Sequence, residues 1–122
     1  MSDSLIQLPD MTTNIDRWQE RIHRIKQELF ELGEMRHGAL SKQFNVCGKP
    51  GCRCKDRESP KKHGPYYQIS YTHQGKSTSE FVKREQVAEA RRQLANYTKF
   101  RRWTQEWVML SVRIARARRK AD

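Results

Sequence analysis

The sequence lacks long apolar runs and is poor in hydrophobic residues. Hydrophobic residues make up 35% of the 122 residues and charged residues 32%. No apolar stretch approaches the roughly 18 residues that a membrane span needs, and the first residues lack the basic and apolar regions of a secretory signal. We therefore expect a cytoplasmic protein with no membrane contact. Its small core would gain stability from a metal, from oligomerisation or from long packed helices.

Catalytic motifs are absent as well. The sequence contains no Walker loop, no HExxH, no GxSxG and no paired carboxylates in a plausible pocket. A lone tyrosine nucleophile, as in DNA-cleaving recombinases, needs a clustered arginine and histidine support set on a larger domain. We therefore expect that the protein is not an enzyme.

Cysteine is scarce, and the three cysteines are clustered. Cys47, Cys52 and Cys54 lie within eight residues of one another. Thiols stay reduced in the cytoplasm, so the cluster points to a metal rather than to a disulfide. The glycines between them permit a tight turn whose backbone N–H groups point at thiolate sulfurs, and a turn between Cys52 and Cys54 would let both reach one ion. The sequence therefore predicts a structural zinc site, because four protein ligands leave no open position on the metal.

The fourth ligand has several candidates. His63 is the best one, because it follows Cys54 by nine residues and directly precedes Gly64-Pro65 and a predicted strand, which would hold the loop at both ends. His37 and His73 are weaker candidates, because one precedes the first strand and the other lies at a hairpin tip. A thiolate from a second chain is a further alternative. Three unliganded surface cysteines or a thiol switch are the readings without a metal.

The hydrophobic spacing predicts an α+β fold with four segments. Residues 1–12 are expected to form a flexible arm, and 13–35 an amphipathic helix with Thr13 or Asn14 as its N-cap. Residues 36–82 would form the zinc loop and a three-stranded antiparallel sheet, and 83–122 a long basic helix. The first helix carries an a/d seam. The seam consists of Ile15, Trp18, Ile22, Ile25, Leu29 and Leu32.

The sheet is predicted from strands over 39–46, 66–72 and 77–82, with a two-residue turn in which Gly75 takes a positive φ. Alternation places Tyr67, Ile69 and Tyr71 on the inner face. The opposite face is polar and could lie against DNA. Its residues are Tyr66, Gln68, Ser70, Thr72, Ser77 and Ser79.

The long helix would extend about 50 Å at 1.5 Å per residue, which is too long for one small core. Its hydrophobic phase slips between Tyr97 and Trp103, so we expect a bend or a change of partner there. Part of the helix should pair with the first helix and part with another chain, which predicts a homodimer. Trp18, Trp103 and Trp107 lie on apolar seams and are expected to be packing anchors.

The net charge of +11 is unevenly distributed. It is −3 over residues 1–35, +6 over 36–82 and +8 over 83–122. An acidic first segment followed by two basic ones suggests pairing within the chain plus a surplus for an anionic partner. Nucleic acid is the commonest such partner of a small basic protein. A basic protein without an anionic partner is the alternative.

The predicted nucleic-acid contacts are basic or polar side chains of the loop, the outer sheet face, the hairpin and the long helix. They are Lys49, Arg53, Lys55, Arg57, Lys61, Lys62, Tyr66, Gln68, Lys76, Arg91, Arg92, Arg101, Arg102, Arg113, Arg116, Arg118 and Arg119. Some loop residues would only neutralise a Cys3His zinc site, whose net charge is about −1, but six exceed that need and suggest phosphate contacts. The last basic residues also suit a helix C-terminus without any ligand.

Several motifs of the sequence resemble those of a family of short prokaryotic proteins. They are Gly38-Ala39-Leu40-Ser41, Cys47-Gly48-Lys49-Pro50-Gly51-Cys52-Arg53-Cys54 and His63-Gly64-Pro65-Tyr66-Tyr67, with Gly75-Lys76 in the hairpin. That family is a domain of unknown function, often encoded near transposases and other mobile-element genes. The resemblance covers about residues 36–108, with a longer insertion around Asp56–Pro60. It implies a mobile-element context and no mechanism.

We expect a zinc-stabilised DNA-binding accessory or regulatory protein for a transposase, a recombinase or a phage-like element. The loop and hairpin would meet the duplex, and the arginine-rich helix would hold phosphates. One alternative is an adaptor that docks a larger enzyme through its helical seams while zinc only shapes the fold. Another is an RNA-binding protein, which would prefer single strands or structured RNA.

Overall fold

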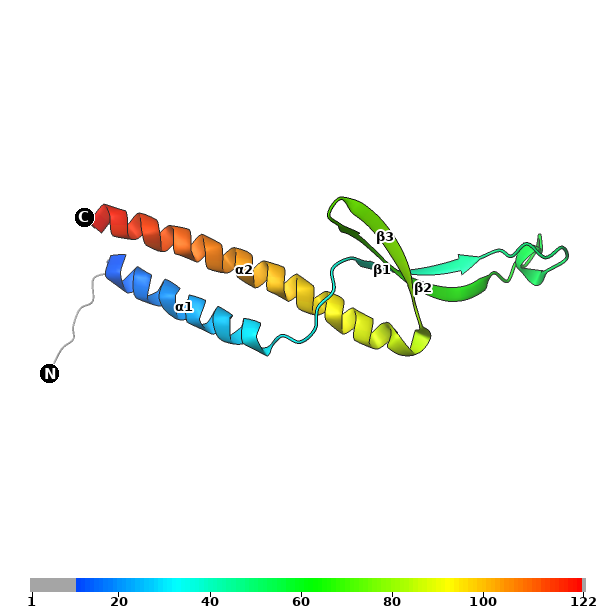
Figure 1. The fold of residues 1–122 in the computed structure, drawn as a ribbon, viewed down its shortest axis with the longest axis horizontal. Coiled ribbons are helices and arrows are strands. Elements are labelled where there is room, and N and C mark those ends of the chain that lie inside the picture. The colour runs from blue at the N-terminus through cyan, green and yellow to red at the C-terminus, as the bar shows by residue number, and fades with distance from the viewer. Residues whose placement is uncertain (1–10, 122) are drawn as a thin grey trace. The chain divides into compact units, whose positions relative to one another are not determined.

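The computed structural model describes residues 11–121 of the chain. The described residues form two α-helices and a three-stranded antiparallel sheet (Figure 1), which confirms the predicted α+β class. Most of the predicted arm, residues 1–10, lies outside the described residues. The elements in chain order are α1 (Met11–Glu31), β1 (Ala39–Asn45), η1 (Arg53–Lys55), β2 (His63–His73), β3 (Lys76–Val82), η2 (Arg84–Gln86) and α2 (Val87–Ala121).

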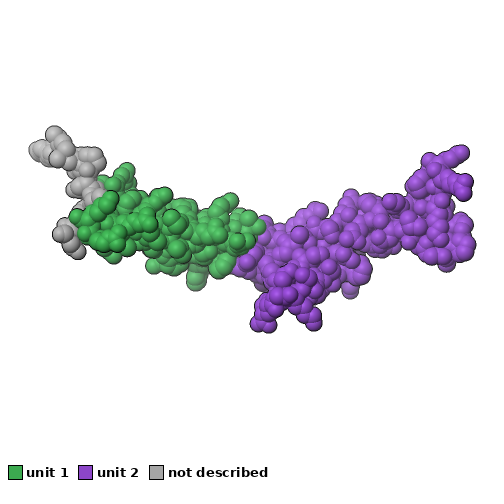
Figure 2. All heavy atoms as spheres, turned by 90° about the horizontal axis from the view of Figure 1, so that it is seen from above, with its two compact units in different colours: residues 1–33, 98–122 green, residues 34–97 purple. Residues whose placement is uncertain are grey.

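The chain divides into two units, which Figure 2 colours separately. Unit 1 comprises residues 1–33 and 98–122, and unit 2 comprises residues 34–97. The division falls within α2, between Tyr97 and Thr98, at the place where the sequence pattern slips. The first part of α2 packs against the sheet of the same chain and the second part belongs with α1 to unit 1, so the helix changes partner where the pattern predicted it.

Unit 1 is a pair of antiparallel helices, α1 and the second part of α2 (Figure 1). Ile25 of α1 is fully buried, and so nearly are Leu110, Ile114 and Ala117 of α2. These residues recur at intervals of three and four, so each helix turns one apolar stripe toward its neighbour. The three tryptophans are half-buried. α1 begins at Met11, two residues before the predicted N-cap, and ends two residues before Gly33.

One ion pair links the two helices of unit 1. Arg21 donates from Nε to Glu106 Oε2 at 2.7 Å and from Nη2 to Glu106 Oε1 at 3.0 Å. Such a fork-to-fork pair fixes the direction of both side chains. The hydrogen bonds from Arg21 lower the pKa of Glu106, and the pair raises the pKa of Arg21. The pair therefore supports the register that the apolar stripes establish.

Unit 2 is built on the sheet, whose strands lie in the order β1-β2-β3. Its inner face packs against the first part of α2. The cluster consists of Ile69, Val82, Val87 and Ala90, with Leu40, Tyr67, Tyr71 and Leu94 packed around it. The predicted inward face of β2 is thereby confirmed. The predicted turn is confirmed too, since Gln74 and Gly75 both have positive φ, as a type I′ turn requires.

Among residues 11–121, neither helix combines the length and the apolar composition that crossing a membrane would demand.

Replacement of Ile25 by alanine should destabilise unit 1. Ile25 is 0% exposed, and a buried Ile→Ala change costs about 2–5 kcal/mol. Urea denaturation followed by tryptophan fluorescence measures this, because Trp18, Trp103 and Trp107 all belong to unit 1. The control Phe30→Ala removes a side chain that is 88% exposed and should cost less than about 0.5 kcal/mol. Equal losses in both variants would contradict this packing.

The interaction between Arg21 and Glu106 should stabilise the fold only while the carboxyl group of Glu106 is ionised. Because the folded pKa of Glu106 is depressed, the stabilisation is present above the ordinary carboxyl pKa and is lost as the pH falls through the depressed value. Both side chains are 38% exposed, so the coupling should be about 0.2–1 kcal/mol. A double-mutant cycle with Arg21→Gln and Glu106→Gln should give this value at neutral pH and nearly zero at a pH well below the depressed pKa of Glu106. A coupling that persists in acid would show that the charge is not its source.

Candidate metal centre and basic surface

The loop between β1 and β2 begins with a tight turn. Pro50 and Gly51 occupy its centre, and the Cys52 N–H donates to the Lys49 carbonyl at 3.4 Å. Gly51 has φ +76°, which is the conformation that the second central position of a type II turn requires. Pro50 suits the first central position, because its ring fixes φ near −65°. The sequence Lys-Pro-Gly-Cys thus reverses the chain between the first two cysteines.

A second turn follows at once and brings the third cysteine back. The Lys55 N–H donates to the Cys52 carbonyl at 3.0 Å in η1. The turn places Cys54, which is only 2% exposed, beside Cys47, whose backbone N–H donates to Cys54 Sγ at 3.4 Å. The chain therefore turns between Cys52 and Cys54, which is the condition for both to face one ion.

The sheet fixes the far end of the loop. Asn45, at the end of β1, lies opposite His63, at the start of β2, after an irregularity in the register. Gly64 has φ +132°, and a Cβ there would come within 2.7 Å of the Gln43 carbonyl oxygen. Only glycine allows the strands to approach so closely at this point. His63 is thus held against β1 at the level where the loop begins.

These contacts bring four ligand atoms together, one each from Cys47, Cys52, Cys54 and His63. All lie within 4.8 Å of one another. The sulfurs of Cys47 and Cys54 are 3.6 Å apart, and Cys52 Sγ is 3.3 Å from His63 Nε2. A disulfide would need a separation of about 2.05 Å, so the thiols are free. The four side chains are close enough to hold a metal ion.

The other two histidines considered as ligands lie at the opposite end of β2. His37 donates from Nε2 to the Thr72 carbonyl at 3.1 Å, and its ring packs edge-on against Tyr71. His73 ends the strand that His63 begins, and its ring lies 6.2 Å from that of His37. Neither belongs to the cluster, so His63 completes the set of four.

The thiols of the cluster differ in acidity. Hydrogen bonds from the Cys54 backbone, and then from the side chains around it, lower the pKa of Cys52 to about 6. Burial raises the pKa of Cys54, although the Cys47 backbone N–H opposes that effect. Because a thiolate is the form that binds metal, the hydrogen bonds that lower the pKa of Cys52 also favour its metal-binding form.

The residues predicted to contact nucleic acid are exposed, except for Gln68, which is half-buried. Of these residues, those from Lys49 to Arg92 belong to unit 2, and those from Arg101 to Arg119 belong to unit 1. Within the loop, Lys55 Nζ donates to the Lys49 carbonyl at 3.0 Å, so one of these lysines also supports the first turn. In unit 1, Arg102 and Arg113 help to lower the pKa of Glu106, so this carboxylate offsets part of their charge.

The loop and the hairpin lie at opposite ends of β2 (Figure 1). β2 has 11 residues, so His63 and His73 are about 33 Å apart at roughly 3.3 Å per residue. Lys76, in the hairpin, is therefore separated from the loop lysines by the length of a strand. A single ligand that touches both ends must be at least this long.

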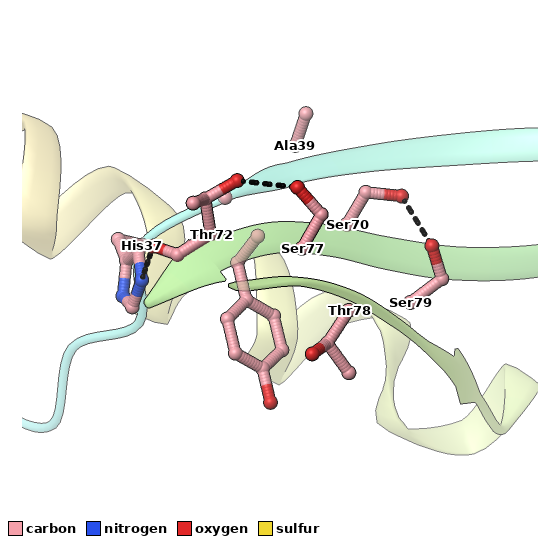
Figure 3. Close-up of a pocket in the computed structure, with 9 residues that line it drawn as sticks. His37, Ala39, Ser70, Thr72, Ser77, Thr78 and Ser79 are labelled. Carbon is pink, nitrogen blue, oxygen red and sulfur yellow. Dashed lines mark hydrogen bonds between the residues drawn. The ribbon is translucent and has the colours of Figure 1, made fainter. Parts of the chain in front are cut away.

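The polar sheet face carries two pairs of hydroxyl groups, which Figure 3 shows. Ser70 and Ser79 are 3.0 Å apart at their Oγ atoms, and Thr72 Oγ1 lies 2.9 Å from Ser77 Oγ. They border a hollow of about 410 Å³ that His37 also lines. The hydroxyls bond across β2 and β3, so they support the hairpin as well as facing outward.

The sequence analysis did not single out Phe81. This side chain is 74% exposed on β3 and lies opposite Gln68. Val82 is buried, so alternation along the strand places Phe81 outward, on the face of Ser77 and Ser79. That alternation is the signal that could have identified an exposed aromatic ring beside Tyr66.

Comparison with known proteins gives one match. A family model described as "Domain of unknown function (DUF6788)" matches residues 15–92. No curated protein and no solved structure matches the sequence. The matched residues include most of α1, the whole sheet and all four members of the cluster, whereas Arg101 and the basic residues after it follow the matched part.

His63→Ala should weaken metal binding far more than His73→Ala. Loss of a second-shell partner already costs 10–100-fold in affinity, so loss of a ligand should cost more than about 100-fold. Metal content after purification, and competition with a chromophoric chelator, measure the difference. His73→Ala is the matched control, because His73 lies at the other end of the same strand. If the two variants retain equal metal and equal affinity, His63 is not a ligand.

Proposed function

We propose that this chain, which belongs to the DUF6788 family of domains of unknown function, is a zinc-stabilised DNA-binding protein. It would act as an accessory or regulatory factor of a mobile element and not as an enzyme. The observation that carries the proposal is the exposed basic surface that surrounds the Cys3His cluster.

Zinc is the metal that this set of ligands favours. Three thiolates and one imidazole are soft or borderline donors, which select zinc over magnesium or calcium. Zn–S bonds of about 2.3 Å and Zn–N bonds of about 2.0–2.1 Å give tetrahedral ligand separations of about 3.8 Å and 3.6 Å. The separations of 3.6 Å between Cys47 and Cys54 and of 3.3 Å between Cys52 and His63 are close to these values. With four protein ligands, the zinc would be structural.

The loop stays cationic after the metal binds. Residues 47–63 include six Lys or Arg and two Asp or Glu. A Cys3His zinc site contributes about −1, so the loop would keep a surplus of about three positive charges. Such a surplus on exposed side chains attracts phosphates and does not depend on base sequence. The loop would therefore position the protein on DNA.

The length of β2 suits a duplex. The loop and the hairpin are about 33 Å apart along the strand, and one helical turn of DNA is about 34 Å. Basic residues at both ends, such as Lys62 and Lys76, would reach the same strand of the duplex one turn apart. The arginine pairs of α2, Arg91-Arg92 and Arg101-Arg102, would add phosphate contacts.

The proposed partners are a second copy of the chain and a transposase or recombinase. Val108 and Met109 of α2, both in unit 1, are 61% and 52% exposed. Apolar side chains with so much exposed surface on a pair of antiparallel helices favour association with another helical surface, as in a homodimer. The resemblance of the cysteine loop to proteins encoded near transposases supports the mobile-element context.

Binding to a random-sequence duplex should depend steeply on salt. The logarithm of affinity should fall linearly with the logarithm of salt concentration, with a slope of about −0.9 per phosphate contact. The double variant Lys61→Gln, Lys62→Gln should therefore reduce the slope by about 2. Gel shifts or fluorescence anisotropy at several salt concentrations measure it.

The matched control is the double variant Arg17→Gln, Arg24→Gln, which removes the same charge from exposed positions of α1. Its slope should stay close to that of the wild type. Absence of duplex binding at low salt would contradict the proposal and favour the protein-interaction adaptor instead.

A further inference from the structure

A hollow of about 580 Å³ lies directly beside the metal cluster, within unit 2. Three members of the cluster form part of its wall, and the rest comes from Asn45, Lys49, Tyr66 and Phe81. The volume falls within the range of about 300–1,000 Å³ that is typical of small-ligand sites. Besides the cluster residues, the walls offer two aromatic rings, one amide and one cation.

Tyr66 and Phe81 belong to the outer face of the sheet and line the same hollow. Tyr66 is 42% exposed and Phe81 is 74% exposed. Gln68 lies opposite Phe81, and Tyr66 precedes Gln68 by two residues in β2. The rings are therefore diagonal neighbours on the same face, a relation close enough for long or aromatic side chains to meet one partner.

Amide side chains neighbour the rings, and the hollow also has a basic side chain in its wall. Gln43 and Gln68 border the rings, and Gln43 Nε2 donates to Gln68 Oε1 at 3.2 Å. Lys49 stands at the edge of the hollow, with Arg53 in the adjacent turn. Aromatic platforms, amide side chains and a basic rim are the features with which proteins bind unpaired bases and their phosphates. An apolar peptide would make no favourable interaction with the basic side chains.

We propose that this hollow takes an unpaired base of single-stranded DNA, stacked on Tyr66 and Phe81, with its phosphates held by Lys49 and the basic loop. The inference rests on the proposed DNA binding and adds a second mode to it. In a duplex the faces of the bases are occupied by stacking within the helix, so the rings can serve only a base that has left the stack. The loop would then join a duplex contact to a single-strand contact, as at a transposon end or a replication fork.

The experiment compares two labelled probes with the metal-loaded full chain. One is a fluorescein-labelled dT 12-mer and the other a 12-base-pair duplex, both followed by fluorescence anisotropy at fixed salt. Base stacking on an aromatic ring is worth enough that Phe81→Ala should weaken binding of the single strand by about 5- to 100-fold. Binding of the duplex should change less than about 2-fold, because phosphate contacts dominate it. Phe81→Trp should restore the single-strand affinity.

Phe30→Ala is the matched control, because it removes another exposed phenylalanine from α1 of unit 1. It should alter neither affinity. Circular dichroism and metal content should show that Phe81→Ala keeps the fold, as expected for an exposed side chain.

Unchanged single-strand affinity in Phe81→Ala and Tyr66→Ala, with duplex binding intact, would overturn this inference and leave the proposed function standing. Failure of both probes to bind at low salt would overturn both. An RNA 12-mer that binds through Phe81 while dT does not would overturn the assignment to DNA. A change of sedimentation behaviour in Phe81→Ala would show that the rings contact a second copy and would overturn it as well.

Discussion

The four clustered side chains of Cys47, Cys52, Cys54 and His63 are the constraint on which the candidate site depends. The loop that they fold has seventeen residues between Asn45 and His63. Among the described residues of that loop, Cys54 alone is buried, so the loop has no apolar core of its own. Ordering so many residues costs more than its few backbone hydrogen bonds return. A metal ion held by these four side chains would supply the missing free energy and would order the loop that carries the basic residues.

The long helix α2 contributes to two separate cores, although the chain has few hydrophobic residues. The first part of α2 covers the inner sheet face with Val87, Ala90 and Leu94. The second part presents Leu110 and Ile114 to α1. Because the apolar stripe shifts around the helix between the two parts, each part can face its own partner. One element therefore closes both units, and the outer sheet face is left to solvent.

Much of this fold could be predicted from the sequence, because its signals are local. Alternation identified Tyr67 and Ile69 as inward, and the spacing of apolar residues identified both helices. The sequence already favoured His63 over His37 as the fourth ligand, and the strand register of the structure brings His63 to Cys52 while His37 bonds to Thr72 at the other end of β2. The packing of the first part of α2 on the sheet was not predicted, because a hydrophobic stripe indicates that a face is covered but not by which element. Phe81 was not predicted because a search for core residues does not identify an exposed aromatic ring.

The division of the chain also means that the two units form from different kinds of contact. Unit 2 is continuous in sequence, from residue 34 to 97, whereas α1 must find its partner in residues after 97. Unit 2 can therefore fold through contacts within one stretch of chain, whereas unit 1 must join two segments that lie on either side of it, which costs more loop-closure entropy. Until those segments meet, the apolar stripe of α1, with Ile25 at its centre, remains without its cover.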